Sequence, residues 1–137
     1  SYTISSGYLS KRDKPFLFWV ASRGHHADIG GIAPGSMTPN ARTIDEEGVY
    51  IDNFKLLDRG RFREAELAEL LTGALHPVRN LGQNIGDIKA QIAANRKGAD
   101  ELGKMVDRFG LDVVEAYMAH VQDNAAESVR RLIARLD

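Results

Sequence analysis

Two long stretches of helical periodicity fill the second half of the chain and limit the folds open to it. Apolar residues there recur at steps of three and four, with one gap in each stretch, which is the spacing of one buried helix face. A first helix is expected to begin at Asn84 and to end at Gly110, and Asp112 is expected to cap a second. Because so short a turn joins them, we expect the two helices to pack antiparallel. The two apolar seams are Ile85, Ile88, Ile92, Ala99, Leu102, Val106 and Phe109, then Val114, Met118, Val121, Ala125, Leu132 and Leu136.

The first 80 residues have a different character. Residues 16–20 are aromatic and branched, as in a buried strand, and residues 48–57 predict a second strand. Between them, residues 24–47 form a long segment rich in glycine and proline, and loops of that length are more often functional than idle. Residues 64–71 predict a short amphipathic helix. The expected fold class is α+β, with short strands and a long Gly/Pro-rich loop in residues 1–80 and paired long helices in residues 81–137.

The length and composition set outer bounds on the class of protein. A chain of 137 residues, 43% hydrophobic and 27% charged, fits a single globular domain. The formal net charge of −1 argues against a nucleic-acid partner or an anionic membrane. The lack of cysteine excludes disulfides and thiolate metal sites. No apolar run approaches the ~20 residues that cross a bilayer, and no signal peptide is visible, so we expect a cytoplasmic protein.

A pair of imidazoles and a carboxylate lies just after the first predicted strand. His25, His26 and Asp28 fall within four positions and are flanked by glycines, which suits a nitrogen and oxygen metal site. Neighbouring residues of a continuing strand point to opposite sides, so only one of the two imidazoles is expected to bind a metal directly. The alternative is that these side chains are hydrogen-bonded loop residues that fix a glycine-rich turn. The pattern alone leaves both interpretations open.

A second polar cluster borders the apolar seam of the first long helix. Asp87, Gln91 and Asn95 are each four residues apart and so form one ridge along the helix. Together with Arg23, beside the histidine pair, they are candidates for binding a polar amide substrate. Such a ridge equally suits a buried network that locks the helix to a neighbouring element. Catalytic residues stay unassigned, because no nucleophile elbow, Walker-type phosphate loop or dinucleotide fingerprint is present.

Several of these segments resemble, in order, the hydantoinase B/oxoprolinase family. The resemblance runs from about Pro15 to the end of the chain and is greatest for 5-oxoprolinases and N-methylhydantoinase B-type subunits. The motifs that carry it are residues 21–31 (Ala-Ser-Arg-Gly-His-His-Ala-Asp-Ile-Gly-Gly), 34–37 (Pro-Gly-Ser-Met), 46–49 (Glu-Glu-Gly-Val), Arg79-Asn80, Asn84, 87–95 (Asp-Ile-Lys-Ala-Gln-Ile-Ala-Ala-Asn) and 117–122 (Tyr-Met-Ala-His-Val-Gln).

The resemblance implies ATP-dependent opening of a cyclic amide ring, such as 5-oxoproline or a hydantoin. A separate hydantoinase A-type subunit or domain is then the partner that uses ATP to activate the ring carbonyl. The B-type part completes the hydrolysis, with a divalent metal (Mn, Zn or Mg) in the full subunit. The metal ligands implied in this chain are His25, His26 and Asp28, and we also expect a homo-oligomer.

The sequence departs from the family in one respect that bears on activity. Relatives with a metal site carry a His-x-x-Asp ligand motif on the amino-terminal side of the paired histidines, but no histidine precedes His25 here. We therefore expect a carboxyl-side fragment of a longer B-type subunit, which by itself neither hydrolyses a lactam nor binds a divalent metal tightly. The alternative function is a structural module, in which the helices dock to the rest of the subunit, to an A-type partner or to a second copy.

Overall fold

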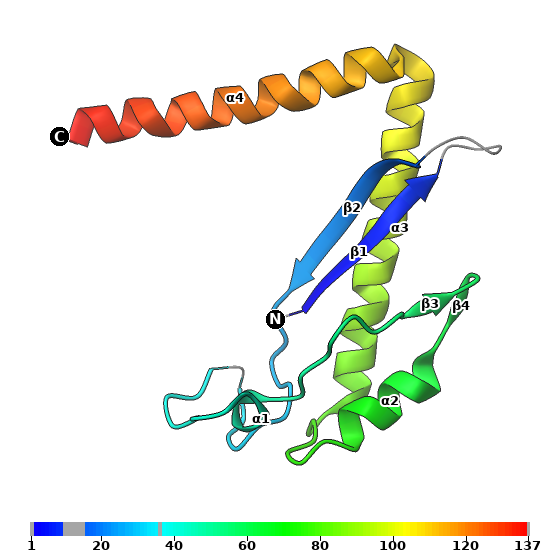
Figure 1. The fold of residues 1–137 in the computed structure, drawn as a ribbon, viewed down its shortest axis with the longest axis vertical. Helices are drawn as coiled ribbons and strands as arrows, with labels where there is room; N and C mark the ends of the chain where they lie inside the picture. Colours follow the sequence, from blue (N-terminus) through cyan, green and yellow to red (C-terminus); the bar gives the residue numbers. More distant parts are fainter. Residues whose placement is uncertain (1, 10–15, 36, 137) are drawn as a thin grey trace.

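The computed structural model describes residues 2–9, 16–35 and 37–136. Strands β1 (Tyr2–Leu9) and β2 (Phe16–Gly24) form an antiparallel hairpin that lies along the middle of the long helix α3 (Leu81–Phe109) (Figure 1). The expected strand at residues 16–20 is confirmed, and it continues to Gly24. The approach of β2 to α3 is close at Gly98, where an added Cβ would lie 3.0 Å from Val20 Cγ1. A small residue there lets the strand pack against the helix.

The hydrophobic core lies around the amino-terminal half of α3. Helix α2 (Glu64–Thr72) places Leu67 and Leu71, both fully buried, against this half. The segments that follow β2 add the apolar side chains of Ile29 and Val49 to the same core. The core cluster consists of Ile29, Val49, Leu67, Leu71, Val78, Ile85 and Ile88. The short helix expected at residues 64–71 is confirmed. It could be predicted because its buried leucines are spaced as on one helix face, a pattern that is visible in the local sequence.

The strand expected over residues 48–57 is wrong. That segment has no regular structure up to Leu56, and only the two-residue strands β3 (Leu57–Asp58) and β4 (Arg61–Phe62) pair. Asn53 has a positive φ of 51°, which interrupts an extended conformation. The apolar side chains of the segment pack on the core although its backbone is irregular. Its composition therefore resembles that of a strand, but no strand forms.

Helix α3 begins earlier than expected. It starts at Leu81, and Asn80 caps it by accepting a hydrogen bond from the Gln83 backbone N–H at 3.1 Å. Asn84, the expected cap, is buried one turn inside the helix. A one-turn helix, α1 (Ile44–Glu47), interrupts the long loop expected over residues 24–47.

The α+β class and the two long carboxyl-terminal helices are confirmed, but the expected antiparallel packing of these helices is wrong. Helix α4 (Leu111–Leu136) leaves the end of α3 at a sharp corner and extends away from the rest of the molecule (Figure 1). Gly110, with a φ of 89°, is the single residue between them. A reversal that lays one helix along another takes a loop of about 2–5 residues. Apart from Val114 near the corner, the described side chains of α4 are exposed or only partly buried.

Candidate functional site

The Gly-His-His segment begins at the last residue of β2 and opens the loop that leads to α1, and this loop lies against the first turn of α3. Its backbone is tied to two other segments by hydrogen bonds: the Gly31 N–H donates to the His76 carbonyl at 3.0 Å, and the Ile32 N–H donates to the Glu46 carbonyl at 2.9 Å. Gly30 and Gly31 have positive φ values of 83° and 86°. An added Cβ at either would lie well under 3.0 Å from a backbone oxygen, so both positions require glycine.

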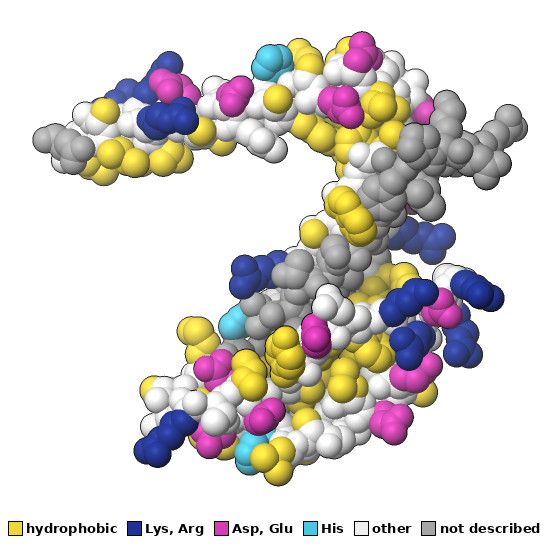
Figure 2. All heavy atoms as spheres, viewed as in Figure 1, with side chains coloured by type: hydrophobic (Ala, Val, Ile, Leu, Met, Phe, Trp, Pro, Cys, Tyr) yellow, Lys and Arg dark blue, Asp and Glu magenta, His cyan; other side chains and the backbone are white. Residues whose placement is uncertain are grey.

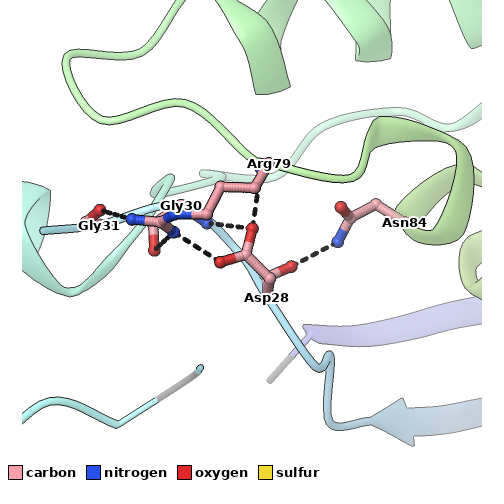
Figure 3. Close-up of polar contacts among 5 residues, drawn as sticks. All are labelled: Asp28, Gly30, Gly31, Arg79 and Asn84. Carbon is pink, nitrogen blue, oxygen red and sulfur yellow. Dashed lines mark hydrogen bonds and ion pairs between the residues drawn. The ribbon is translucent and has the colours of Figure 1, made fainter. Parts of the chain in front are cut away.

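Arg79 holds this loop from the segment just before α3 (Figure 3). Its guanidinium donates to Asp28 Oδ1 at 2.6 Å and to the Gly31 carbonyl at 2.7 Å, with a longer contact of 3.4 Å to the Gly30 carbonyl. The Arg79 backbone N–H donates to the other carboxylate oxygen of Asp28 at 2.8 Å. Both oxygens of Asp28 are therefore engaged by the same residue, and the carboxylate acts as the anchor of the turn.

Asn84 fixes the other side of Asp28. Its side-chain nitrogen lies 2.7 Å from the Asp28 carbonyl oxygen (Figure 3). The same nitrogen lies 3.3 Å from His26 Nδ1. Both Asn84 and His26 are only 2% exposed. Burial lowers the pKa of His26 below 6.5, although the nearby Asp87 carboxylate acts to raise it. The His26 imidazole is thus neutral near pH 7.

The three predicted metal ligands are not arranged as one ligand set. His25 is exposed while His26 is buried, and Asp28 accepts hydrogen bonds from Arg79. Within residues 2–9, 16–35 and 37–136, no group of three or more His, Asp or Glu side chains is placed to hold a metal ion. Asp28 holds the glycine-rich turn through Arg79, and His26 lies beside Asn84.

Three of the four predicted substrate-binding residues lie on α3 and the fourth, Arg23, lies on β2, and their surroundings differ. Gln91 packs directly against Gly24, where an added Cβ would lie 2.1 Å from its side-chain nitrogen, and Asn95 is 3% exposed. Asp87 is half exposed, and Arg23 is exposed on β2. Gln91 therefore lies at the interface between helix and hairpin and Asn95 is buried, while Asp87 and Arg23 are accessible.

A separate hollow of about 570 Å³ lies on the side of the core formed by α1 and α2. It is lined by Asp45, Gly48, Val49, Tyr50, Phe54, Glu66, Glu69, Leu70, Gly73, Ala74, Leu75 and His76. None of the residues predicted to bind metal or substrate lines it. His76 connects the hollow to the Gly-His-His loop: it lines the hollow, and its carbonyl oxygen accepts the hydrogen bond from the Gly31 N–H.

Comparison with known proteins shows the family of the chain. The model of the hydantoinase B/oxoprolinase family matches residues 9–137. The chain belongs to this family. It is 50% identical to a 5-oxoprolinase of Dictyostelium discoideum over 117 residues, which are 85% of this chain and 9% of that protein. It is 42% identical to 5-oxoprolinase 1 of Arabidopsis thaliana over 125 residues, covering 85% of this chain and 10% of the relative.

A shorter relative in the hydantoinase B/oxoprolinase family is the caprolactamase subunit beta of Pseudomonas jessenii. The identity is 35% over 117 residues, which are 85% of this chain and 19% of the relative. The chain thus spans between 9% and 19% of the length of these three relatives. No solved structure matches it. In the described part of the chain, no helix is both long enough and apolar enough to cross a membrane.

Arg79 and Asn84 hold the loop in place, although neither was among the predicted site residues. Each contacts a residue about 50 to 60 positions earlier, which local periodicity does not reveal. The available signal was their position: polar side chains directly before and at the start of an apolar helical seam. Such side chains form hydrogen bonds either with the free backbone groups of the helix end or with a neighbouring loop. Here Asn80 caps the helix, while Arg79 and Asn84 donate hydrogen bonds to the loop.

We expect acid to weaken the turn through Asp28. Burial acts to raise the pKa of Asp28, but hydrogen bonds from Arg79 and Gly30 outweigh it and lower that pKa below 3.8. Stability from the ionised carboxylate is therefore complete above the unfolded pKa and is lost as the pH falls through the lower, folded value. Urea unfolding of the wild type and Asp28→Asn between pH 6 and 2.5 checks this. The free energy difference between them should shrink in the acid range; a pH-independent difference would contradict the assignment.

Proposed function

We propose that this chain is part of an ATP-dependent hydrolase that opens a cyclic amide, with residues 24–47 contributing to its active site. The names of the relatives support the reaction class, since oxoproline and caprolactam are both cyclic amides. The structural observation that carries the proposal is the fixed loop. Arg79 and Asn84 hold the Gly-His-His turn through its backbone and Asp28, while His25 is exposed. Catalytic groups are commonly presented on loops that a rigid scaffold holds in place.

The chemistry explains why ATP and a second component are expected. A ring amide is a poor electrophile, because its nitrogen donates electron density to the carbonyl carbon. Transfer of a phosphoryl group to the carbonyl oxygen, by a hydantoinase A-type subunit or domain, makes that carbon reactive and creates a leaving group. Water then adds at the carbon, and the ring carbon–nitrogen bond breaks, which leaves a free amine and an acyl phosphate. A second water hydrolyses the acyl phosphate to a carboxylate and inorganic phosphate. The word "subunit" in the name of the caprolactamase relative is consistent with a divided enzyme.

The residues present do not fit a divalent metal as a complete site. Asp28 uses both carboxylate oxygens to bind Arg79, and a catalytic metal usually needs three protein ligands. No step is therefore routed through a metal held by this chain alone. We propose that the isolated chain neither opens a lactam nor binds Mn²⁺, Zn²⁺ or Mg²⁺ tightly. Calorimetry showing stoichiometric, sub-micromolar binding of one of these ions would contradict that proposal.

Replacement of His25 tests the active-site assignment. In the complete protein, assayed with its ATP-using partner, His25→Ala should lower ring opening by about 100-fold or more, because a positioned catalytic group typically contributes at least that much. Product formation from 5-oxoproline and from a hydantoin should be followed together with ADP release, which separates loss of hydrolysis from loss of activation. His76→Ala is the control, since only its backbone carbonyl holds the loop. Full activity of His25→Ala would show that the loop is not part of the catalytic centre.

A second candidate function, docking through α4, is favoured by the uncovered apolar face of that helix. Figure 2 shows apolar side chains gathered along one side of the extended arm. Val121, Leu132 and Leu136 are 66%, 56% and 79% exposed. A contiguous apolar stripe of this kind commonly marks an interaction surface.

The charges along α4 favour a second copy of this chain as the occupant. The first half of the helix carries Asp112, Glu115 and Asp123 and no Lys or Arg, whereas the second half carries Arg130, Arg131 and Arg135 with Glu127. Two copies paired antiparallel about a twofold axis would bring each acidic half against a basic half. Their apolar stripes would face each other along the same interface.

Leu132→Asp should abolish this pairing. It places a charge in the apolar stripe, and we expect the dissociation constant measured by sedimentation to rise at least tenfold. Ala134→Asp adds the same charge on the opposite side of α4 and should leave association unchanged. A wild-type chain that stays monomeric at tens of micromolar would exclude a second copy as the partner and leave an A-type subunit as the alternative.

A further inference from the structure

The orientation of the Asn84 side chain is fixed by a group that can only accept a hydrogen bond. The side-chain atom 2.7 Å from the Asp28 carbonyl oxygen must be the amide nitrogen, because a flipped amide would place two acceptor oxygens at that distance. Both groups are held in place: Asn84 is buried on α3, and Asp28 is anchored by Arg79. The carbonyl of Asp28 therefore determines which end of the Asn84 amide faces His26.

The fixed amide in turn determines where the proton of His26 resides. The same Asn84 nitrogen lies 3.3 Å from His26 Nδ1, and its second N–H is available to that atom. An amide N–H requires a lone pair on its partner, so Nδ1 must be unprotonated. Asp87 Oδ2 does not compete for a proton on Nδ1, because it lies 3.8 Å away, beyond hydrogen-bond distance, and its side chain is half exposed. In the neutral imidazole the proton is then on Nε2.

We infer that Asn84 is a positioning residue that fixes His26 as the Nε2–H tautomer and so makes Nε2 the hydrogen-bond donor of the ring. Histidines that bind metals usually have the opposite arrangement: the second ring nitrogen donates its N–H to an acceptor, which leaves a lone pair for the cation. Here the second ring nitrogen faces a donor. The Nε2 atom of His26 is thus matched to an oxygen acceptor and not to a metal ion.

Nitrogen NMR of the protein labelled with ¹⁵N-histidine tests the tautomer directly. Long-range correlations between ring protons and nitrogens distinguish a protonated from an unprotonated ring nitrogen, and His26→Gln assigns the signals. Near neutral pH, His26 should show an unprotonated Nδ1 and a protonated Nε2. A wild-type His26 protonated on Nδ1 would overturn the inference without reference to any variant.

Two further measurements separate positioning from mere support of the fold. Asn84→Asp replaces the donor with an acceptor and should move the His26 proton to Nδ1, whereas Asn80→Asp, at the α3 cap, should leave the His26 pattern unchanged. Addition of Zn²⁺ should leave the His26 ring-nitrogen signals in place. A proton that stays on Nε2 in folded Asn84→Asp, or a saturable change at Nε2 with Zn²⁺, would contradict the role assigned to Asn84.

Discussion

Gly30→Ala should destabilise the protein by about 2–5 kcal/mol, the sum of left-handed backbone strain and overpacking. Gly30 has a φ of 83°, and an ideal Cβ would lie 2.2 Å from the His76 carbonyl oxygen and 3.1 Å from the Pro77 carbonyl carbon. Both neighbours are backbone atoms, and the His76 carbonyl already accepts the Gly31 N–H. Accommodation of the methyl group therefore requires the loop and the segment before α3 to separate. Urea unfolding monitored by circular dichroism measures the loss.

Gly35→Ala is the matched control for this substitution. Gly35 has a similar φ of 94°, but an added Cβ would meet no atom within 4 Å among the described residues beyond its chain neighbours. Its substitution should cost only the backbone strain of about 1–2 kcal/mol. In the complete protein, Gly30→Ala should also reduce ring opening under conditions where the variant remains folded, because the Gly-His-His turn is displaced. Equal destabilisation by the two substitutions would show that the close approach to His76 contributes nothing.

Arg79→Met should lower the free energy of unfolding by about 2–3 kcal/mol, the range for loss of hydrogen bonds to a charged, largely buried partner. The variant keeps the aliphatic part of the side chain and the backbone N–H. It removes the guanidinium contacts to Asp28 Oδ1 at 2.6 Å and to the Gly31 carbonyl at 2.7 Å. The Asp28 side chain, only 14% exposed, then has no opposite charge beside it. Chemical denaturation, with hydrogen exchange at residues 28–32, measures the effect and its location.

A surface ion pair of similar length provides the comparison for Arg79. Lys89 Nζ lies 2.8 Å from Glu64 Oε2, with both side chains 51% exposed. Lys89→Met should cost no more than about 1 kcal/mol, as is usual for exposed pairs. The double variant of Arg79→Met with Asp28→Asn should be less destabilised than the sum of the single variants, because each removes the same interaction. Additive effects would mean that Arg79 acts on the loop through the glycine carbonyls alone.

Local patterns in the sequence predicted the elements that local interactions determine. The apolar spacing of α2 and α3 and the aromatic run of β2 needed no knowledge of distant partners. The antiparallel helix pair was expected because a short turn normally brings helices together, yet the conformation of one residue, Gly110, directs α4 away. Residues 48–57 resembled a strand because apolar packing on the core and strand formation favour similar side chains.

The candidate site could be located from the sequence, but the roles within it could not. The order His25, His26, Asp28 pointed to a functional turn, and proximity in sequence suggested shared ligands. The structure assigns Asp28 to Arg79, 51 residues away, and places His26 beside Asn84, 58 residues away. Contacts over such separations depend on how α3 packs against the loop. Spacing within the motif carries no information about that packing.

The corner at Gly110 makes α4 a lever. A helix of 26 residues is about 39 Å long, and the dihedral angles of one glycine set its direction relative to α3. A change of about 10° there would carry the far end through about 7 Å, by the geometry of a rigid rod of that length. The same change of angle at Gly110 would barely move Val114, which is buried near the start of α4. Small local adjustments at one peptide unit are thereby converted into large displacements of the distal arginines and leucines, while the turn around Asp28 stays where it is.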